Sequence, residues 1–164
     1  MEAQGLYFPT GEFKTLVTSC GGEWNDRKER PLVCLVRSLE SDKLFWAIPM
    51  GDMAHRSEAQ RLRIDKYLNL PKRDIRSCYY HVAMTDKESL FFISDAVPIT
   101  DKYIERAYEV GGCGYIIKNP ATVAILRSKL FRILAAENRN PNSFRQHITA
   151  VKLCLLAELD EAKN

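Results

Sequence analysis

Two apolar runs decide the fold of this chain: Leu32-Val33-Cys34-Leu35-Val36-Arg37 and Leu44-Phe45-Trp46-Ala47-Ile48-Pro49-Met50. Both are short and dense in β-branched, aliphatic and aromatic residues, a composition typical of strands. The segment between them contains Glu40-Ser41-Asp42, which is polar and favours a turn. The two runs therefore predict a β-hairpin.

The sequence after this hairpin predicts a second one. Its strands are Ile75 to Met84 and Leu90 to Val97, joined by Thr85-Asp86-Lys87, so the sheet is expected to be mostly antiparallel. A short helix is predicted between the hairpins, from Glu58 to Leu68. Its start is marked by Ser57, which is followed three residues later by a glutamine in the capping-box pattern.

The flanking regions give weaker or more local signals. Asn119-Pro120 and Asn140-Pro141 each place an N-cap residue before a proline suited to the first helical position, so we expect two C-terminal helices to begin there. Thr100 to Val110 is predicted to be a further short helix. The first 30 residues are interpreted as an arm and a loop, with one strand at Leu6 to Phe8.

Strands followed by helices, without a repeat or a linker, predict one α+β domain over residues 1–164. A chain of this length can bury a substantial core. We expect a small, curled antiparallel β-sheet or SH3-like barrel over about residues 31–99, with helices packed against it. The C-terminal helical part is expected over about residues 119–162.

Composition excludes several classes of protein. The chain has 24 lysines and arginines against 21 aspartates and glutamates, and a net charge of +3 is too small for a protein that coats nucleic acid. The five cysteines form no C-x-x-C pair, so neither a disulfide framework nor a zinc site is indicated. Nothing resembles a signal peptide or a membrane span, and the protein is expected in the cytoplasm.

A basic segment, residues 53–81, nevertheless carries more than the whole net charge. It has seven basic residues against three acidic ones, and it includes His55, His81, Tyr67, Tyr79 and Tyr80. Aromatic rings beside cations suit single-stranded nucleic acid, because bases stack on the rings and phosphates bind the cations. Candidate RNA-binding residues in this segment are therefore Arg61, Lys66, Arg76, Tyr79 and His81. Lys28, just ahead of the first strand, is a further candidate as a cation at the mouth of the barrel. A solvated helix face is the alternative interpretation of the same charges.

His55 is the most informative single residue, because it lies on a glycine-containing turn between a predicted strand and a predicted helix. Arg56 and Ser57 follow it, and Arg30 directly precedes the first strand. An imidazole can take a proton from a ribose 2′-OH or give one to the leaving 5′-oxygen, while a cation stabilises the charged phosphorane. The candidate catalytic residues are therefore His55, Ser57, Arg30 and Arg56. The alternative interpretation is a surface histidine for His55, a helix cap for Ser57 and a flexible charged loop around Arg30.

No standard enzymatic motif is present elsewhere. Gly111-Gly112-Cys113-Gly114 lacks the spacing of a phosphate-binding loop and is interpreted as a turn, and the sequence has neither H-E-x-x-H nor G-x-S-x-G. His81 is expected on a strand, either packed or facing a groove. We expect no metal and no cofactor, because this route to RNA cleavage needs neither.

Four stretches taken in order resemble the RNase toxins of type III toxin–antitoxin and phage abortive-infection systems, the ToxN, CptN and AbiQ group. They are Arg30-Pro31-Leu32-Val33-Cys34-Leu35-Val36, Ala47-Ile48-Pro49-Met50, Phe92-Ile93-Ser94-Asp95-Ala96-Val97-Pro98-Ile99, and the helix from Asn119-Pro120 that contains Lys129, Phe131 and Ile133. The resemblance covers about residues 25 to 140.

This resemblance implies a MazF/PemK-like barrel and a metal-independent endoribonuclease that leaves a 2′,3′-cyclic phosphate. It implies cellular or phage mRNA as substrate, inhibition by a repeated RNA pseudoknot, and a closed ring of protein and RNA. The better-known members carry a catalytic Thr-Ser-Pro-Lys loop where this chain has Gly51-Asp52-Met53-Ala54. The nearest groups of matching chemistry are His55, Arg56 and Ser57.

Two other functions remain open on the sequence. One is a non-catalytic RNA-binding regulatory module on the same barrel, which tolerates the missing catalytic loop. The other is a MazF-like toxin with a protein antitoxin. The DNA upstream of the reading frame discriminates a toxin with an RNA antitoxin from a toxin with a protein antitoxin, because tandem repeats favour the RNA and a small overlapping gene favours the protein.

Overall fold

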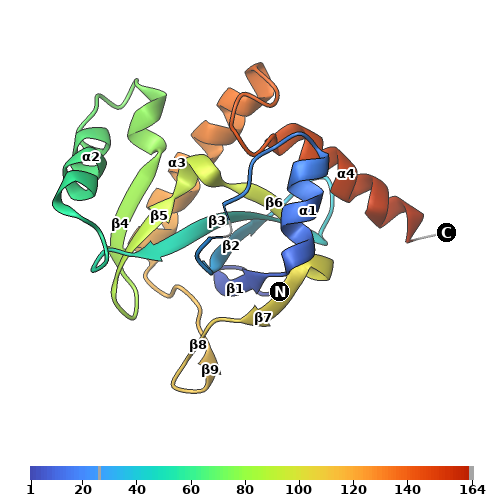
Figure 1. Cartoon of the computed structure of the whole chain (residues 1–164), viewed down its shortest axis with the longest axis horizontal. Coiled ribbons are helices and arrows are strands. Elements are labelled where there is room, and N and C mark those ends of the chain that lie inside the picture. The colour runs from blue at the N-terminus through green and yellow to red at the C-terminus, as the bar shows by residue number, and fades with distance from the viewer. Residues whose placement is uncertain (26, 163–164) are drawn as a thin grey trace.

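The computed structural model describes residues 1–25 and 27–162 and has an α+β architecture (Figure 1). A curled, antiparallel sheet carries four α-helices in this part of the chain. The sheet strands are β1 Gly5–Pro9, β2 Leu32–Arg37, β3 Leu44–Asp52, β4 Tyr80–Met84, β5 Glu88–Phe92, β6 Val97–Thr100 and β7 Ile104–Ala107. Their order is β4-β5-β3-β2-β1-β7, with β6 also paired to β3. As described, the sheet curls without closing into a barrel.

The predicted central hairpin is confirmed, and its second strand organises the sheet. β3 pairs with β2 over Phe45 to Pro49. Its first residues also pair with β6, and its last three, Met50 to Asp52, pair with β5. Because β3 changes partners along its length, its C-terminal end projects beyond β2 toward the β4–β5 hairpin. The candidate site forms at this end.

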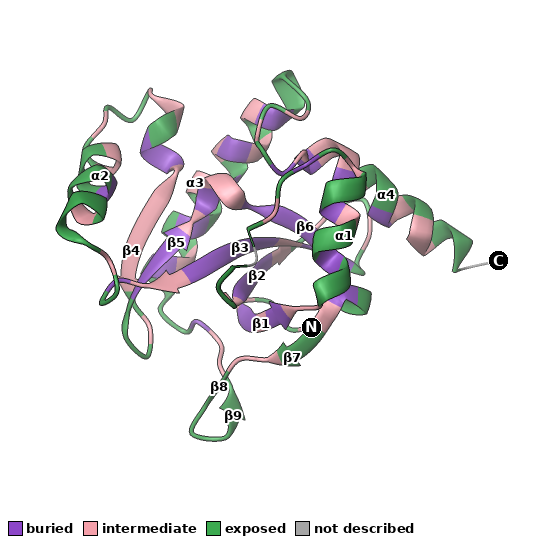
Figure 2. Ribbon diagram, viewed as in Figure 1, coloured by how far each residue is buried: buried purple, intermediate pink, exposed green. Residues whose placement is uncertain are grey.

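Both faces of the central strands are buried, which explains why their sequences are continuously apolar rather than alternating. Along β2, Val33 and Leu35 pack into one apolar cluster with helix α3, Pro120–Arg139. Leu32 and Cys34 pack into another with helices α1, Gly11–Ser19, and α4, Ile148–Glu161. Figure 2 shows the buried strands between exposed helix surfaces.

The second predicted hairpin is confirmed in shortened form. β4 and β5 pair from Tyr80↔Phe92 to Met84↔Glu88. The expected outer ends are instead 3-10 turns, Ile75–Cys78 and Ile93–Asp95. The helix α2, Glu58–Leu68, begins where predicted, and both hydrogen bonds of the Ser57–Gln60 capping box are present.

The N-terminal region is not the arm that the sequence suggested. β1, which contains the predicted strand Leu6 to Phe8, pairs with β2 and β7. Phe13 and Val17 lie on α1 and are fully buried. The sheet therefore extends beyond the expected limits of residues 31–99.

The prediction of a helix over Thr100 to Val110 is wrong. This region forms the 3-10 turn Asp101–Tyr103, the strand β7 and the short strand β8, Glu109–Val110, which pairs with β9, Cys113–Gly114. β7 pairs with β1, about a hundred residues earlier, so a long-range partner determines its conformation. The glycines at 111 and 112 have positive φ and form the turn of the small β8–β9 hairpin, in agreement with the interpretation of this stretch as a turn.

The two C-terminal helices are present, but only the first begins as predicted. Asn119 caps α3 by accepting hydrogen bonds from the N–H groups of Ala121 and Thr122. α4 begins at Ile148 instead of Pro141. The buried carboxylate of Glu137 accepts hydrogen bonds from the Asn142 N–H and from Thr149, which stabilises a non-helical turn between α3 and α4. None of the helices in the described ranges is long and apolar enough to cross a membrane.

Candidate functional site

Two arginine side chains share one aromatic ring at the end of β3. The guanidinium carbon of Arg30 lies 4.6 Å from the centre of the Phe92 ring, and that of Arg56 lies 5.2 Å from it. Arg30 precedes β2, Arg56 follows β3, and Phe92 ends β5. Antiparallel pairing of β3 with both neighbours brings these three chain segments together. We call the hollow around them the arginine pocket.

Neither guanidinium forms a hydrogen bond or an ion pair with another described side chain or backbone group, although both contact the ring. The Nε atom of Arg56 is buried and has no hydrogen-bond partner. Burial lowers the pKa of Arg30, and the nearby charges of Arg56 and Arg145 lower it further. An arginine remains protonated under these conditions, so the pocket holds positive charge that an anion can neutralise.

Gly51 makes this arrangement possible. A Cβ atom at this position would lie 2.7 Å from an Nη atom of Arg56 and 3.1 Å from the Phe92 ring. Any larger residue would therefore compete with the stacking of Arg56. The absence of a side chain at Gly51 is therefore what lets the Arg56 guanidinium reach the Phe92 ring.

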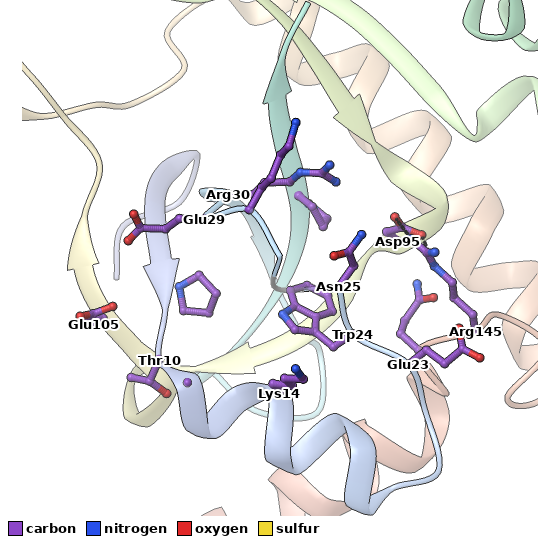
Figure 3. A pocket seen from close by; sticks show the side chains of 15 residues that line it. Thr10, Lys14, Glu23, Trp24, Asn25, Glu29, Arg30, Asp95, Glu105 and Arg145 are labelled. Carbon is purple, nitrogen blue, oxygen red and sulfur yellow. Dashed lines mark hydrogen bonds and ion pairs between the residues drawn. The ribbon is translucent and has the colours of Figure 1, made fainter. Parts of the chain in front are cut away.

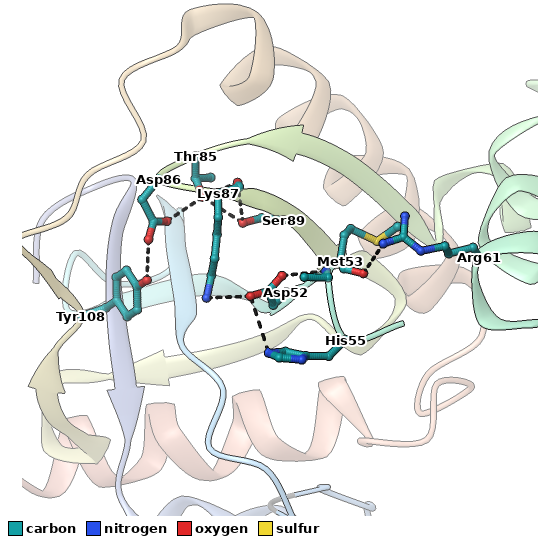
Figure 4. Close-up of polar contacts among 10 residues, drawn as sticks. Asp52, Met53, His55, Arg61, Thr85, Asp86, Lys87, Ser89 and Tyr108 are labelled. Atoms are coloured by element: carbon teal, nitrogen blue, oxygen red, sulfur yellow. Dashed lines mark hydrogen bonds and ion pairs between the residues drawn. The ribbon is translucent and has the colours of Figure 1, made fainter. Parts of the chain in front are cut away.

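Asp52 and His55 both line the pocket, and Figure 4 shows their side chains next to each other. The Asp52 carboxylate accepts a hydrogen bond from the Ala54 N–H at 2.7 Å and forms an ion pair with Lys87 at 3.1 Å. These contacts lower the pKa of Asp52, the Ala54 N–H most. The His55 Nε2 lies 3.8 Å from the same carboxylate, and 78% of its side chain is exposed. His55 is therefore oriented near a carboxylate yet accessible to a ligand.

Tyr108 supplies a hydroxyl group at the same pocket. It donates a hydrogen bond of 2.7 Å to Asp86, on the β4–β5 turn. Burial, followed by this hydrogen bond, raises the pKa of Tyr108 to about 12. Tyr108 is consequently a neutral phenol near pH 7 and cannot act there as a base.

The arginine pocket has a volume of about 270 Å³. Its lining includes Phe8, Lys28, Arg30, Gly51, Asp52, His55, Arg56, Lys87 and Tyr108. Lys28, Glu29 and Arg30 also line a neighbouring pocket that contains Trp24 (Figure 3). The two pockets are thus contiguous along the segment that precedes β2.

The structure brings four of the predicted site residues to the arginine pocket: Lys28, Arg30, His55 and Arg56. Ser57 is adjacent in sequence, but its side chain caps α2. Arg61 donates a hydrogen bond of 2.6 Å to the Met53 carbonyl and fastens α2 to the end of β3. Their contacts give Ser57 and Arg61 structural roles.

The remaining predicted RNA-binding residues lie away from the pocket. Arg76 is bound by the Asp74 carboxylate, which raises the pKa of Arg76. Tyr79 stacks on Tyr67 of α2, and Lys66 is exposed on the same helix. None of these three residues lines the arginine pocket.

His81 lies on the opposite face of the β4–β5 hairpin from Phe92. Tyr80 pairs with Phe92 and His81 with Phe91, so the alternation of strands separates the two pairs. Burial, followed by the charge of Lys129 on α3, lowers the pKa of His81 to about 4. The packed alternative for this residue therefore agrees with the structure, and His81 does not converge with His55.

Sequence analysis missed Phe92, on which both guanidiniums stack, and also Asp52, Lys87 and Tyr108, which line the pocket. Phe92 and Lys87 stand near the ends of β5, and only the register of β5 against β3 places them there. Asp52 gave a local signal, because an Asp directly after a strand commonly accepts a hydrogen bond from the backbone N–H two residues later, in an Asx turn. Tyr108 had no comparable signal.

Within residues 1–25 and 27–162, no group of three or more histidine, cysteine, aspartate or glutamate side chains is arranged to hold a metal ion. A scan against protein-family models gives no match, and a search of curated proteins likewise gives none. The function is therefore argued from the chemistry of the pocket.

Proposed function

We propose that this protein is an endoribonuclease that cleaves RNA without a metal ion, at the arginine pocket. The observation that carries the proposal is the pair of guanidiniums, Arg30 and Arg56, held on one ring without a carboxylate partner. Arginine donates planar pairs of hydrogen bonds that match a phosphate. Two such groups in a partly desolvated pocket suit a phosphate whose negative charge increases in the transition state.

The proposed reaction is an internal phosphoryl transfer. The ribose 2′-oxygen attacks phosphorus and loses its proton, the bond from phosphorus to the 5′-oxygen breaks, and the 5′-oxygen gains a proton. The products are a 2′,3′-cyclic phosphate and a 5′-hydroxyl. His55 exchanges one of these protons, and the Asp52 carboxylate lies 3.8 Å from its Nε2. Arg30 and Arg56 bind the phosphate oxygens.

The proposal extends to a biological class: the toxin of a type III toxin–antitoxin or phage-defence system, with a MazF/PemK-like sheet. The sequence resemblance over residues 25 to 140 supports it, and so does an antiparallel sheet that precedes the two long C-terminal helices. The partners would be a repeated pseudoknot RNA antitoxin in a ring-shaped complex and cellular or phage mRNA, in the cytoplasm. A protein antitoxin is the alternative.

A non-catalytic RNA-binding module is the second candidate. The observation that favours it is the absence of the Thr-Ser-Pro-Lys loop, because Gly51 and Met53 bring no reactive group and Asp52 is paired with Lys87. Such a module would use the same guanidiniums to bind phosphates. It would bind RNA without changing it.

The decisive experiment incubates the purified protein with a 5′-labelled single-stranded RNA in EDTA. Cleavage products that end in a 2′,3′-cyclic phosphate are expected, and an RNA with a single 2′-deoxynucleotide should survive at that position. Intact RNA at high protein concentration would overturn the enzymatic proposal. If that RNA is nevertheless bound, with a log–log salt slope of about −0.7 per phosphate contacted, the second candidate holds.

A further inference from the structure

The pocket next to the arginine pocket has a different character. Trp24 lies on one of its walls, near the start of the segment that leads to Arg30 (Figure 3). The Trp24 ring packs edge-on against the buried Phe13 at 5.1 Å, which supports it from α1. The volume of this Trp24 pocket is about 180 Å³. It is lined by Thr10, Trp24, Asn25, Lys28, Glu29, Arg30, Pro49, Asp95, Glu105, Arg145 and Gln146, among others.

Gln146 brings an unsatisfied hydrogen-bond acceptor to this pocket. Its side chain is 1% exposed, and its Nε2 donates to the carbonyls of Ser94 and Ala96 at 2.8 and 2.9 Å. Both partners are acceptors, so the amide orientation is determined: the NH₂ group must face them. Its Oε1 is buried and has no hydrogen-bond partner in the part of the chain that the structure describes. An acceptor left in this state costs free energy, which a bound donor can offset.

Thr10 adds a second unpaired group. Its Oγ1 is buried without a hydrogen-bond partner, although Thr10 occupies the N-cap position of α1, where such a hydroxyl usually accepts a backbone hydrogen bond. Among the described residues, the Thr10 hydroxyl therefore leaves its hydrogen-bonding capacity unused beside the pocket. Two buried polar atoms without partners in one pocket point to a ligand with hydrogen-bonding edges.

The charges of the Trp24 pocket are balanced, unlike those of the arginine pocket. Arg145 forms two hydrogen bonds to the Asp95 carboxylate, at 3.1 and 2.6 Å, and these raise the pKa of Arg145. Glu29, on the side shared with the arginine pocket, forms an ion pair with Arg106. A neutral ligand with an aromatic face fits these surroundings better than a phosphate does.

We propose that the Trp24 pocket binds one unstacked nucleobase with an exocyclic amino group, next to the phosphate at Arg30 and Arg56. This inference rests on the proposed RNA substrate and adds base selectivity to it. The base stacks on Trp24, and its amino group donates to the Gln146 Oε1. Adenine, cytosine and guanine carry such a group, whereas the single N3–H donor of uracil is flanked by two carbonyl oxygens that this acceptor would repel.

The test measures binding rather than cleavage. Four fluorescein-labelled pentanucleotides, 2′-O-methylated throughout so that they cannot be cleaved, have uracil at every position except the centre, which is A, C, G or U. Fluorescence anisotropy gives the affinity of each for the full-length protein. The three RNAs with an amino-bearing central base should bind about 2- to 13-fold more tightly than the all-uracil RNA, the range for one hydrogen bond.

Three variants assign the effect to the pocket. Trp24→Leu should weaken binding of the three preferred RNAs by about 5- to 150-fold through lost stacking, with Trp46→Phe as the matched control at the other tryptophan. Gln146→Met should remove the preference against uracil. Thr10→Val deletes a hydroxyl that makes no hydrogen bond with the described residues, so this variant keeps the test valid if Gln146→Met does not fold. It should reduce the difference in affinity between the amino-bearing RNAs and the all-uracil RNA.

The outcomes separate this inference from the proposed function. Equal binding of all four RNAs, dependent on Arg56 and unaffected by Trp24→Leu, would overturn the base pocket and leave the RNA-binding site in place. No detectable binding of any RNA by the wild-type protein would overturn both. A preference for amino-bearing bases that persists in Gln146→Met and Thr10→Val would place selectivity elsewhere and also refute the pocket.

Discussion

Arg56 and Arg76 belong to the same basic segment, yet the structure uses them in opposite ways. Arg76 lies against Asp74, which accepts several hydrogen bonds from it, the shortest 2.7 Å. The Arg56 guanidinium stacks on Phe92 beside Arg30 and forms neither a hydrogen bond nor an ion pair with a described residue. Counting charges along a sequence cannot separate the two cases. The partners of each cation determine whether its charge is available to a ligand.

The same difference separates the two histidines of this segment. His55 is exposed at the arginine pocket, whereas His81 is half-buried on the other face of the β4–β5 hairpin, near Lys129. Within the basic segment, His55 and Arg56 therefore line the arginine pocket, and residues 57–81 mainly form α2 and β4 beside it. The substitutions below each compare a residue at the pocket with a matched control residue elsewhere.

His55→Ala is expected to have the largest effect. If His55 exchanges a proton in the reaction, the cleavage rate should fall by about 10²- to 10⁴-fold, measured in single-turnover reactions with labelled RNA. His81→Gln is the matched variant and should cleave at nearly the wild-type rate. The reverse pattern, with His81 essential and His55 dispensable, would break the comparison.

Arg56→Ala should lower kcat by about 10²- to 10³-fold, the usual result of removing one donor to a charged transition state. Arg76→Ala removes the same charge from the same segment and should change the rate little, because Asp74 already neutralises it. RNA cleavage and RNA binding by both variants provide the measurement. Equal losses in the two variants would show that general electrostatic attraction, rather than the arginine pocket, accounts for binding.

Gly51→Ala should have a moderate effect that isolates the stacking geometry. The added Cβ would meet Arg56 at 2.7 Å and Phe92 at 3.1 Å. Displacing the guanidinium from the ring forfeits about 0.5–2 kcal/mol, or about 2- to 30-fold in RNA affinity. Gly114→Ala, whose Cβ would meet only Ala107 at an ordinary 3.8 Å, is the control. Wild-type affinity in Gly51→Ala would mean that stacking on Phe92 contributes nothing.

The elements that the sequence predicted correctly depend on local signals. The β2–β3 hairpin follows from two apolar runs around a polar turn, and α2 and α3 begin at the caps Ser57 and Asn119. The errors concern contacts that these signals do not encode. β7 is a strand because β1 pairs with it, and α4 begins late because the Glu137 carboxylate accepts hydrogen bonds from Asn142 and Thr149 and so stabilises the preceding turn.

The candidate site divides in the same way. His55 and Arg56 were predictable because they are neighbours on one turn, and Arg30 because it adjoins the first strand. Phe92, which brings the two arginines together, and Lys87, which holds Asp52, depend on strand register. The sequence did not show that Arg61 donates to the Met53 carbonyl, eight residues earlier, whereas the contact of Arg76 with Asp74, two residues earlier, is a local one.

The pH dependence of stability provides the smallest expected effect and tests the place of His81. Its pKa is lowered to about 4 in the folded protein, against about 6.5 in an unfolded chain. Between these values the unfolded chain binds more protons, so the free energy of unfolding should fall as the pH falls from about 6.5 toward 4. The contribution cannot exceed about 1.4 kcal/mol per pH unit for one proton, and partial exposure of the ring reduces it. Urea unfolding at pH 7 and pH 5, above the range in which carboxylates titrate, measures this slope. His81→Gln should make it shallower, and an identical slope would mean that His81 is solvated like His55, which would erase the distinction between them.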